Sequence, residues 1–143
     1  MGVGVLRSVK DAAGGRVVVG VGARSRVLES DLDFAVDDAL AAAGLTSADV
    51  GVLATLDRRV LSEAVRAFAG RRGWILRAFP AAALAAREVP HPNGAHAARV
   101  GTPSVAEAAA LLAAGAEAEL VLPKRVYPCV TVAVGRGGAR RPI

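Results

Sequence analysis

The chain has 143 residues, of which 53% are hydrophobic, with a formal net charge of +5 and one cysteine, Cys129. This length and composition predict a single globular domain with a substantial core, and one cysteine excludes an internal disulfide or a cysteine-based metal cluster. No apolar run is long enough to span a membrane, and residues 1–15 lack the features of a secretory signal, so we expect a cytoplasmic protein without a membrane partner. The few aromatic residues are scattered and form no stacking platform, so we expect no nucleic-acid partner either.

The first third of the chain predicts a strand followed by a helix. Residues 1–15 are expected to form a flexible N-terminal segment. The valine run in residues 16–21 is typical of a strand buried on both faces. After a short turn, apolar residues at helical spacing predict a helix over residues 27–43, which Gly44 ends. Five acids between Glu29 and Asp38 are assigned to its solvated outer face.

The middle of the chain repeats this alternation. Residues 50–55 and 74–79 are predicted strands, and a helix over residues 61–71 lies between them. Pro80 opens a short alanine-rich helix that ends at Ala86. The segment 87–100, rich in proline and glycine and containing His91 and His96, is expected to be a loop.

A sharply capped helix follows in residues 101–115. Ser104 and Glu107 have the spacing of a capping box, in which the Ser104 hydroxyl accepts from the Glu107 amide and the carboxylate accepts from the Ser104 amide. Thr102 before Pro103 is an alternative start. Only alanine and leucine follow Glu107 up to Gly115, so we expect burial on more than one side, with the amides at the N-terminus free to bind an anion.

The remaining segments complete a three-layer α/β/α domain. Residues 119–122 and 129–135 are predicted strands joined by a connection over residues 123–128, which is too short for a helical crossover, so the last strand should be antiparallel. We therefore expect a mainly parallel sheet of about five strands. Residues 137–143 are expected to form a basic tail.

Polar and cationic residues collect where these predicted strands end and where the capped helix begins. Ligands of such sheets bind beyond the carboxyl ends of the strands, so we expect a binding cleft there. The candidate ligand-binding residues are Gly22, Arg24, Arg59, Gly101, Thr102, Ser104, Glu107, Lys124 and Arg125, and the candidate acid/base or hydrogen-bonding residues are Thr55 and Asp57.

Several motifs allow a second interpretation. Gly20 and Gly22 follow the start of a dinucleotide fingerprint, but its third glycine and its ribose-binding acid are missing, so they are interpreted as permitting a tight turn. Asp57 is either a proton-transfer group or the N-cap of the next helix. Lys124 and Arg125 either hold an anion over the capped helix or lie in a surface connection. The two histidines lack further ligands nearby, so neither a metal site nor a cofactor is expected.

The sequence resembles a known family: the cobalamin-biosynthesis proteins of the CobE type and the C-terminal domain of CbiG. The strongest match is Val100 to Leu111, which follows the pattern G-x-x-S-V-A-E-A-A-A-L. Weaker matches follow in the expected order, at residues 20–24, 54–59, 122–125 and 130–134. The resemblance covers residues 16–136 and implies a protein that binds a tetrapyrrole-derived intermediate and acts beside other cobalamin-pathway enzymes.

The resemblance leaves three functional hypotheses. The first is binding of a carboxylate-rich precorrin or corrinoid intermediate in the cleft. The second is lactone opening on cobalt-precorrin-5A with release of acetaldehyde, with Asp57 as the base; that hydrolase has additional N-terminal domains, so partner domains would be needed. The third is a non-catalytic interaction module whose basic tail contacts an acidic partner. Arg59 stands where the family usually has lysine, which changes the geometry of that cation.

Overall fold

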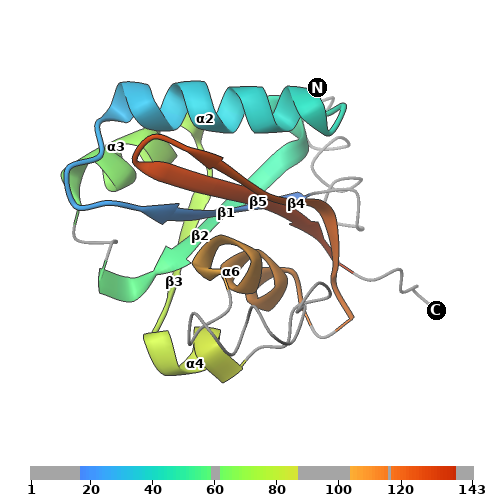
Figure 1. The fold of residues 1–143 in the computed structure, drawn as a ribbon. Coiled ribbons are helices and arrows are strands. Elements are labelled where there is room, and N and C mark those ends of the chain that lie inside the picture. Colours follow the sequence, from blue (N-terminus) through green and yellow to red (C-terminus); the bar gives the residue numbers. More distant parts are fainter. Residues whose placement is uncertain (1–16, 59–61, 87–103, 116, 138–143) are drawn as a thin grey trace, which may run out of the picture.

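The computed structural model describes residues 17–58, 62–86, 104–115 and 117–137, and this part of the chain contains one sheet of five strands (Figure 1). The strands are β1 (Val17–Ala23), β2 (Val50–Leu56), β3 (Ile75–Phe79), β4 (Glu119–Tyr127) and β5 (Val130–Arg136). Their spatial order is β3-β2-β1-β5-β4. β1, β2 and β3 are parallel, whereas β5 is antiparallel to both of its neighbours, β1 and β4. Four strands therefore share one direction and the last strand is reversed, which confirms the predicted fold class.

Helices cover both faces of the sheet, giving three layers. α2 (Glu29–Ala42) and α3 (Glu63–Arg72) lie on one face, and α4 (Ala81–Ala86) and α6 (Val105–Ala114) lie on the other (Figure 1). The alternation of side chains along β1 explains how one strand serves both cores. Val17, Val19 and Val21 are buried in the core with α2, whereas Val18 is buried in the core with α6. The prediction of a strand buried on both faces is confirmed.

α6 packs unusually close to the sheet, because small residues face it. An added Cβ at Gly20 would lie 2.8 Å from the Ala110 amide nitrogen, and one at Gly135 would lie 3.2 Å from the Ala110 carbonyl oxygen. Ala106 to Leu111 are all buried, as expected for a helix that is apolar all round. Gly20 lies within β1 and not in a turn, so its interpretation as a turn residue is wrong. A glycine is required at this position because α6 approaches β1 closely.

Two helix boundaries differ from the predictions. α3 is capped by Ser62, whose hydroxyl accepts from the Val65 amide at 3.4 Å, so Asp57 is not the N-cap of that helix. α2 begins after Leu28, which is exposed, and so starts two residues later than the predicted residue 27. The glycine that ends each helix has the positive φ required: 76° at Gly44 and 74° at Gly73.

β4 is longer than predicted. It continues through Pro123, Lys124 and Arg125 to Tyr127, so the expected connection over residues 123–128 shrinks to a tight turn at Pro128 and Cys129. Pro123 is tolerated because β4 is an edge strand and its register against β5 is irregular at this point. Cys129 has a φ of 71°, which a tight hairpin turn requires.

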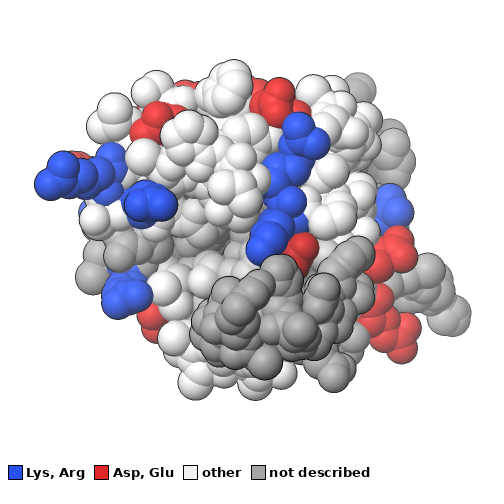
Figure 2. Space-filling view, viewed as in Figure 1, with Lys and Arg blue, Asp and Glu red and all other residues white. Residues whose placement is uncertain are grey.

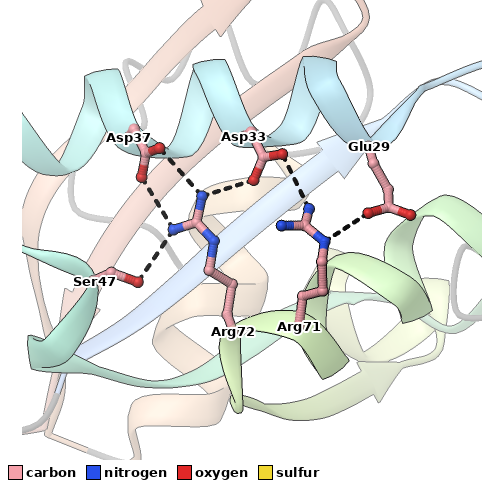
Figure 3. Close-up of polar contacts among 6 residues, drawn as sticks. All are labelled: Glu29, Asp33, Asp37, Ser47, Arg71 and Arg72. Carbon is pink, nitrogen blue, oxygen red and sulfur yellow. Dashed lines mark hydrogen bonds and ion pairs between the residues drawn. The ribbon is translucent and has the colours of Figure 1, made fainter.

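The acidic residues of α2 do not all lie on a free solvated face, which corrects that prediction. The Arg71 Nε donates to Glu29 at 2.8 Å, and the Arg72 guanidinium bonds Asp33 at 2.7 Å and Asp37 at 3.0 Å (Figure 3). Ion pairs therefore join α2 to α3. Partial burial acts to raise the pKa of Asp33, but the hydrogen bonds from Arg72 and Arg71 outweigh it and hold that pKa below its ordinary value.

Several predictions fall on residues outside the described ranges. They concern the N-terminal segment, the loop over residues 87–100 with its two histidines, and the basic tail from residue 138 onward. Within the described residues, no helix combines the length and the apolar character needed to cross a membrane.

Candidate functional site

A pocket of about 550 Å³ opens where β1, β2 and β4 end and α6 begins. The three strands share one direction, so their carboxyl ends meet at the same edge of the sheet, and α6 starts above that edge. Its volume is in the range of small-molecule sites. The described residues that line it are Gly22, Ala23, Arg24, Ser25, Leu56, Arg58, Ser104, Val105, Ala106, Lys124, Val126, Tyr127, Cys129, Val130 and Thr131.

The first turn of α6 lines this pocket. The Ser104 hydroxyl accepts from the Glu107 amide at 3.3 Å, so the predicted cap of the helix is confirmed. The amides of Val105 and Ala106 occupy the first helical positions, which have no acceptor within the helix, and both residues line the pocket. Amides in the first turn of a helix, at the positive end of its dipole, favour an anion.

Glu107 does not complete the capping box. Its carboxylate accepts from the backbone amide of Lys124 on β4 at 3.0 Å, not from the amide of Ser104. The side chain is buried, with 5% of its surface exposed. Among the candidate ligand-binding residues, Glu107 is therefore turned toward β4 and is absent from the described pocket lining.

Three cations line the pocket: Arg24 after β1, Arg58 after β2 and Lys124 on β4. None of them forms an ion pair with a carboxylate among the described residues. Figure 2 shows lysine and arginine side chains at the left and near the middle of the view, with mostly uncharged surface between them, and a further one at the right. The predicted cluster of cations at the edge of the sheet is thus present for Arg24 and Lys124, and the sequence analysis missed Arg58.

Apolar side chains form much of the remaining wall. Leu56, Val126 and Val130 line the pocket together with Ala106. Val126 is 73% exposed, which is high for a large aliphatic residue on a strand. The pocket therefore offers an uncharged, partly apolar surface between cationic groups, which suits a ligand with an apolar body and acidic substituents.

Arg125 is directed to the opposite face of the sheet, so it is not one of the pocket cations. Its Nε donates to the Tyr127 hydroxyl oxygen at 3.0 Å, and its guanidinium lies 3.6 Å from the Asp38 carboxylate on α2. The Tyr127 hydroxyl donates to Asp38 at 2.7 Å, and burial together with this hydrogen bond raises the pKa of Tyr127. Arg125 therefore joins β4 to α2, which corrects its expected place in the cleft.

The two candidate acid/base residues also lie apart from the pocket lining. Thr55 is fully buried, and its hydroxyl donates to the Val21 carbonyl oxygen at 2.9 Å. Asp57 is exposed just beyond the end of β2. The described lining contains neither a carboxylate nor a histidine that could act as a general base.

Three candidate residues, Arg59, Gly101 and Thr102, fall outside the described residues. The structure brings together Gly22, Arg24, Ser104 and Lys124 from three separate places in the sequence. The sequence analysis missed Ser25, Arg58 and the hairpin residues Cys129 to Thr131. Arg58 follows Asp57 at the end of a predicted strand, so the rule that led to Asp57 contained the signal for it.

Comparisons with known proteins identify the family. A family model described as "Cobalamin synthesis G C-terminus" matches residues 17–135. The chain is 33% identical over 124 residues to Protein CobE of Sinorhizobium sp, covering 85% of this chain and 80% of that protein. It is similar to the crystal structure of CobE, a protein from the cobalamin (vitamin B12) biosynthetic pathway, with a TM-score of 0.74 and 26% identity over 85% of this chain and 93% of that one.

A second solved structure gives the same result. Cobalamin biosynthesis protein chiG from Agrobacterium tumefaciens superposes with a TM-score of 0.69 and 33% identity, covering 86% of this chain and 99% of that one. The chain therefore covers 80% to 99% of the length of these three relatives. The chain belongs to the cobalamin synthesis G C-terminus family of cobalamin biosynthesis proteins.

Proposed function

We propose that this protein binds a carboxylate-rich precorrin or corrinoid intermediate of cobalamin biosynthesis in the pocket at the carboxyl edge of its sheet. The observation that supports this most is the composition of the pocket: Arg24, Arg58 and Lys124 line it, together with Val105 and Ala106 from the first turn of α6. Every charged group in the described lining is a cation, so the pocket selects for an acidic ligand.

The chemistry of the proposed ligand matches this arrangement. Corrinoid acids carry several carboxylates around a broad and largely apolar ring. The two arginines suit bidentate capture of carboxylates, and Lys124 contributes a point charge. The apolar wall at Val126 and Val130 contacts the ring, while the cations and the α6 amides bind its acidic side chains.

The proposal assigns a role to each group at the site. Arg24, Arg58 and Lys124 bind separate carboxylates, and the amides of Val105 and Ala106 bind one carboxylate at the helix N-terminus. Gly22 lines the pocket beside the first turn of α6, where an added Cβ would make an ordinary contact with Val105 at 3.5 Å. Arg59, Gly101 and Thr102 are neighbours of these groups in the sequence and are proposed to complete the same rim.

Lactone opening with release of acetaldehyde is the second candidate, and Asp57 beside Arg58 is the feature that favours it. This carboxylate is exposed at the end of the strand that also supplies a pocket cation. Enzymatic assay of acetaldehyde, with cobalt-precorrin-5A as substrate, tests this reaction. Release that disappears in Asp57→Asn would support it, and no release even with the other pathway proteins present would refute it.

Calorimetric titration tests the binding proposal. The ligand is cobyrinic acid, a corrinoid with free acid side chains, and the matched control ligand has the same ring with the acids converted to amides. We expect binding of the acid and at least about tenfold weaker binding of the amide, because one charge-assisted hydrogen bond contributes about 1.5 to 3 kcal/mol.

Variants locate the binding site in the same assay. Arg24→Gln and Lys124→Gln should each weaken binding of the acid by about tenfold. Arg136→Gln is the matched control, because Arg136 is a cation paired with Glu119 outside the pocket. Equal binding of acid and amide, or equal losses in all three variants, would refute the assignment of the pocket, and no binding of either ligand would favour an interaction module instead.

A further inference from the structure

Strand β4 contains two extra residues opposite β5, one at Val121 and a second just after Leu122. Leu122 pairs with Val134 and Arg125 pairs with Val132, so Pro123 and Lys124 together face the single Ala133. Two residues opposite one define a β-bulge, which locally interrupts the hydrogen-bond ladder. We refer to Pro123 and Lys124 as the β4 bulge.

The β4 bulge changes the face on which Lys124 lies. Leu122 packs into the core beneath α2, and Arg125 reaches Asp38 on α2, so both lie on the α2 side of the sheet. In a regular strand the residue two positions after Leu122 would lie on that same side. Lys124 instead lines the pocket on the α6 side. Counted from Leu122, the β4 bulge therefore places Lys124, and not Arg125, on the pocket side.

Glu107, on α6, forms a hydrogen bond with the backbone of the β4 bulge. Its carboxylate accepts from the Lys124 amide at 3.0 Å, and the side chain is only 5% exposed. Pro123 has no amide hydrogen, so the Lys124 amide is the single backbone donor of the β4 bulge. One buried hydrogen bond thus joins the first turn of α6 to the backbone of a pocket cation.

We propose that Glu107 is a positioning residue for anion binding: by accepting from the Lys124 amide, it fixes the β4 bulge and holds the Lys124 side chain at the start of α6. This inference rests on the proposed function, because it assigns Glu107 a role at the same pocket. A carboxylate beside an anion site would itself oppose an anionic ligand. The hydrogen-bond acceptor, not the negative charge, is therefore what the site requires of Glu107.

Two replacements of Glu107 separate the acceptor from the charge. Glu107→Gln retains a carbonyl oxygen that can accept from the Lys124 amide, whereas Glu107→Leu has similar bulk and no acceptor. With cobyrinic acid as the probe, we expect Glu107→Leu to weaken binding by about tenfold, as loss of one charge-assisted contact would. Glu107→Gln should restore binding to within about twofold of the original chain or tighten it, since it also removes an unfavourable charge.

A double-mutant cycle tests whether Glu107 acts through Lys124. If it does, adding Glu107→Leu to Lys124→Gln should weaken binding by no more than about a further twofold, because the contact that Glu107 positions is already lost. Losses that multiply, a Glu107→Leu variant that binds normally, or a Glu107→Gln variant as weak as Glu107→Leu would each overturn the inference.

Amide hydrogen exchange of the unaltered chain gives a test that does not depend on the folding of any variant. The Lys124 amide should exchange slowly despite its place on an edge strand, because a buried carboxylate holds it. Rapid exchange would overturn the inference even where cobyrinic acid binds normally, which leaves the proposed function intact. Failure of the unaltered chain to bind cobyrinic acid would remove both.

Discussion

Substitution of Gly20 by alanine tests how α6 is seated on the sheet. The added Cβ would lie 2.8 Å from the amide nitrogen of Ala110 and 2.9 Å from its Cβ, and closer still to the carbonyl oxygen of Ala106. Ordinary contacts of a Cβ begin at 3.4 Å, so α6 must move away from β1, and the Ala106 carbonyl oxygen, which would lie nearest, sets the size of that movement. The obstructing atoms are mainly helix backbone, which cannot move aside as a flexible side chain could.

The expected cost follows from this overlap. Forcing extra volume into a packed core costs about 1 to 3 kcal/mol. Alanine restricts the unfolded chain more than glycine does, and this offsets about 0.4 to 1 kcal/mol. We expect a net loss of about 1 to 2 kcal/mol in the free energy of unfolding, which lowers the melting temperature by roughly 3 to 10 °C for a domain of this size.

Gly22→Ala is the matched control for this prediction. It lies two residues further along β1 on the same face, but its added Cβ would meet Val105 at 3.5 Å, an ordinary contact. Thermal unfolding followed by circular dichroism should therefore show a lower melting temperature for Gly20→Ala and no loss for Gly22→Ala. Equal melting temperatures for the two variants would refute the close seating of α6.

Three further predictions concern the ion pairs and the buried threonine. In urea denaturation, Arg72→Gln should lower the free energy of unfolding by about 1 to 3 kcal/mol, because Arg72 is only 13% exposed and bonds two acids of α2. Arg71 is half-exposed, so Arg71→Gln should lower it clearly less. Equal losses in the two variants would contradict this prediction. The folded-state pKa of Asp33 lies below its ordinary value of 3.8, so its contribution to stability is complete above that value and is lost as the pH falls below about 4. Melting curves from pH 6 to pH 3 should therefore show a smaller acid-induced loss for Asp33→Asn than for the unaltered chain, and identical profiles would exclude this contribution. Thr55→Val should lower the free energy of unfolding by about 1 kcal/mol, because it removes the hydrogen bond to the Val21 carbonyl oxygen. The affinity for cobyrinic acid should stay unchanged, and a tenfold loss of affinity would show that Thr55 belongs to the binding site.

Local patterns in the sequence were sufficient for most of the fold. The valine run of β1 has no polar position, and this predicted burial on both faces, which the two cores confirm. Ser104 and the alanine-rich segment after it predicted a capped and buried helix because both signals lie within one turn of each other. The antiparallel last strand followed from the short distance between two apolar segments.

The features that sequence reasoning missed depend on contacts between distant segments. We predicted that Pro123 begins a connection between strands, because no local pattern in the sequence distinguishes a bulge on an edge strand from the end of a strand. Lys124 and Arg125 lie on opposite faces because they are adjacent on a strand, and the bulge affects which of the two faces the pocket. Likewise, the acids of α2 resembled a solvated face because their partners, Arg71 and Arg72, lie more than thirty residues away in the chain.

The sequence predicted where the candidate site lies better than it predicted which residues form it. The rule that ligands bind beyond the carboxyl ends of parallel strands located the pocket correctly. It gave no means of deciding which side chains there point inward, so it included buried Thr55 and omitted Arg58. Only the pairing of the strands and the position of α6 fix those directions.

An NMR titration of the ¹⁵N-labelled chain with cobyrinic acid tests the central claim most directly, because it reports which amides the ligand approaches. We predict that the largest shifts occur at Val105 and Ala106, with accompanying changes at Arg24 and Lys124, and that the amidated corrinoid produces much smaller shifts at these positions. Saturable binding that leaves the first turn of α6 unchanged would contradict the account, because the pocket and the α6 amides would then not be the site.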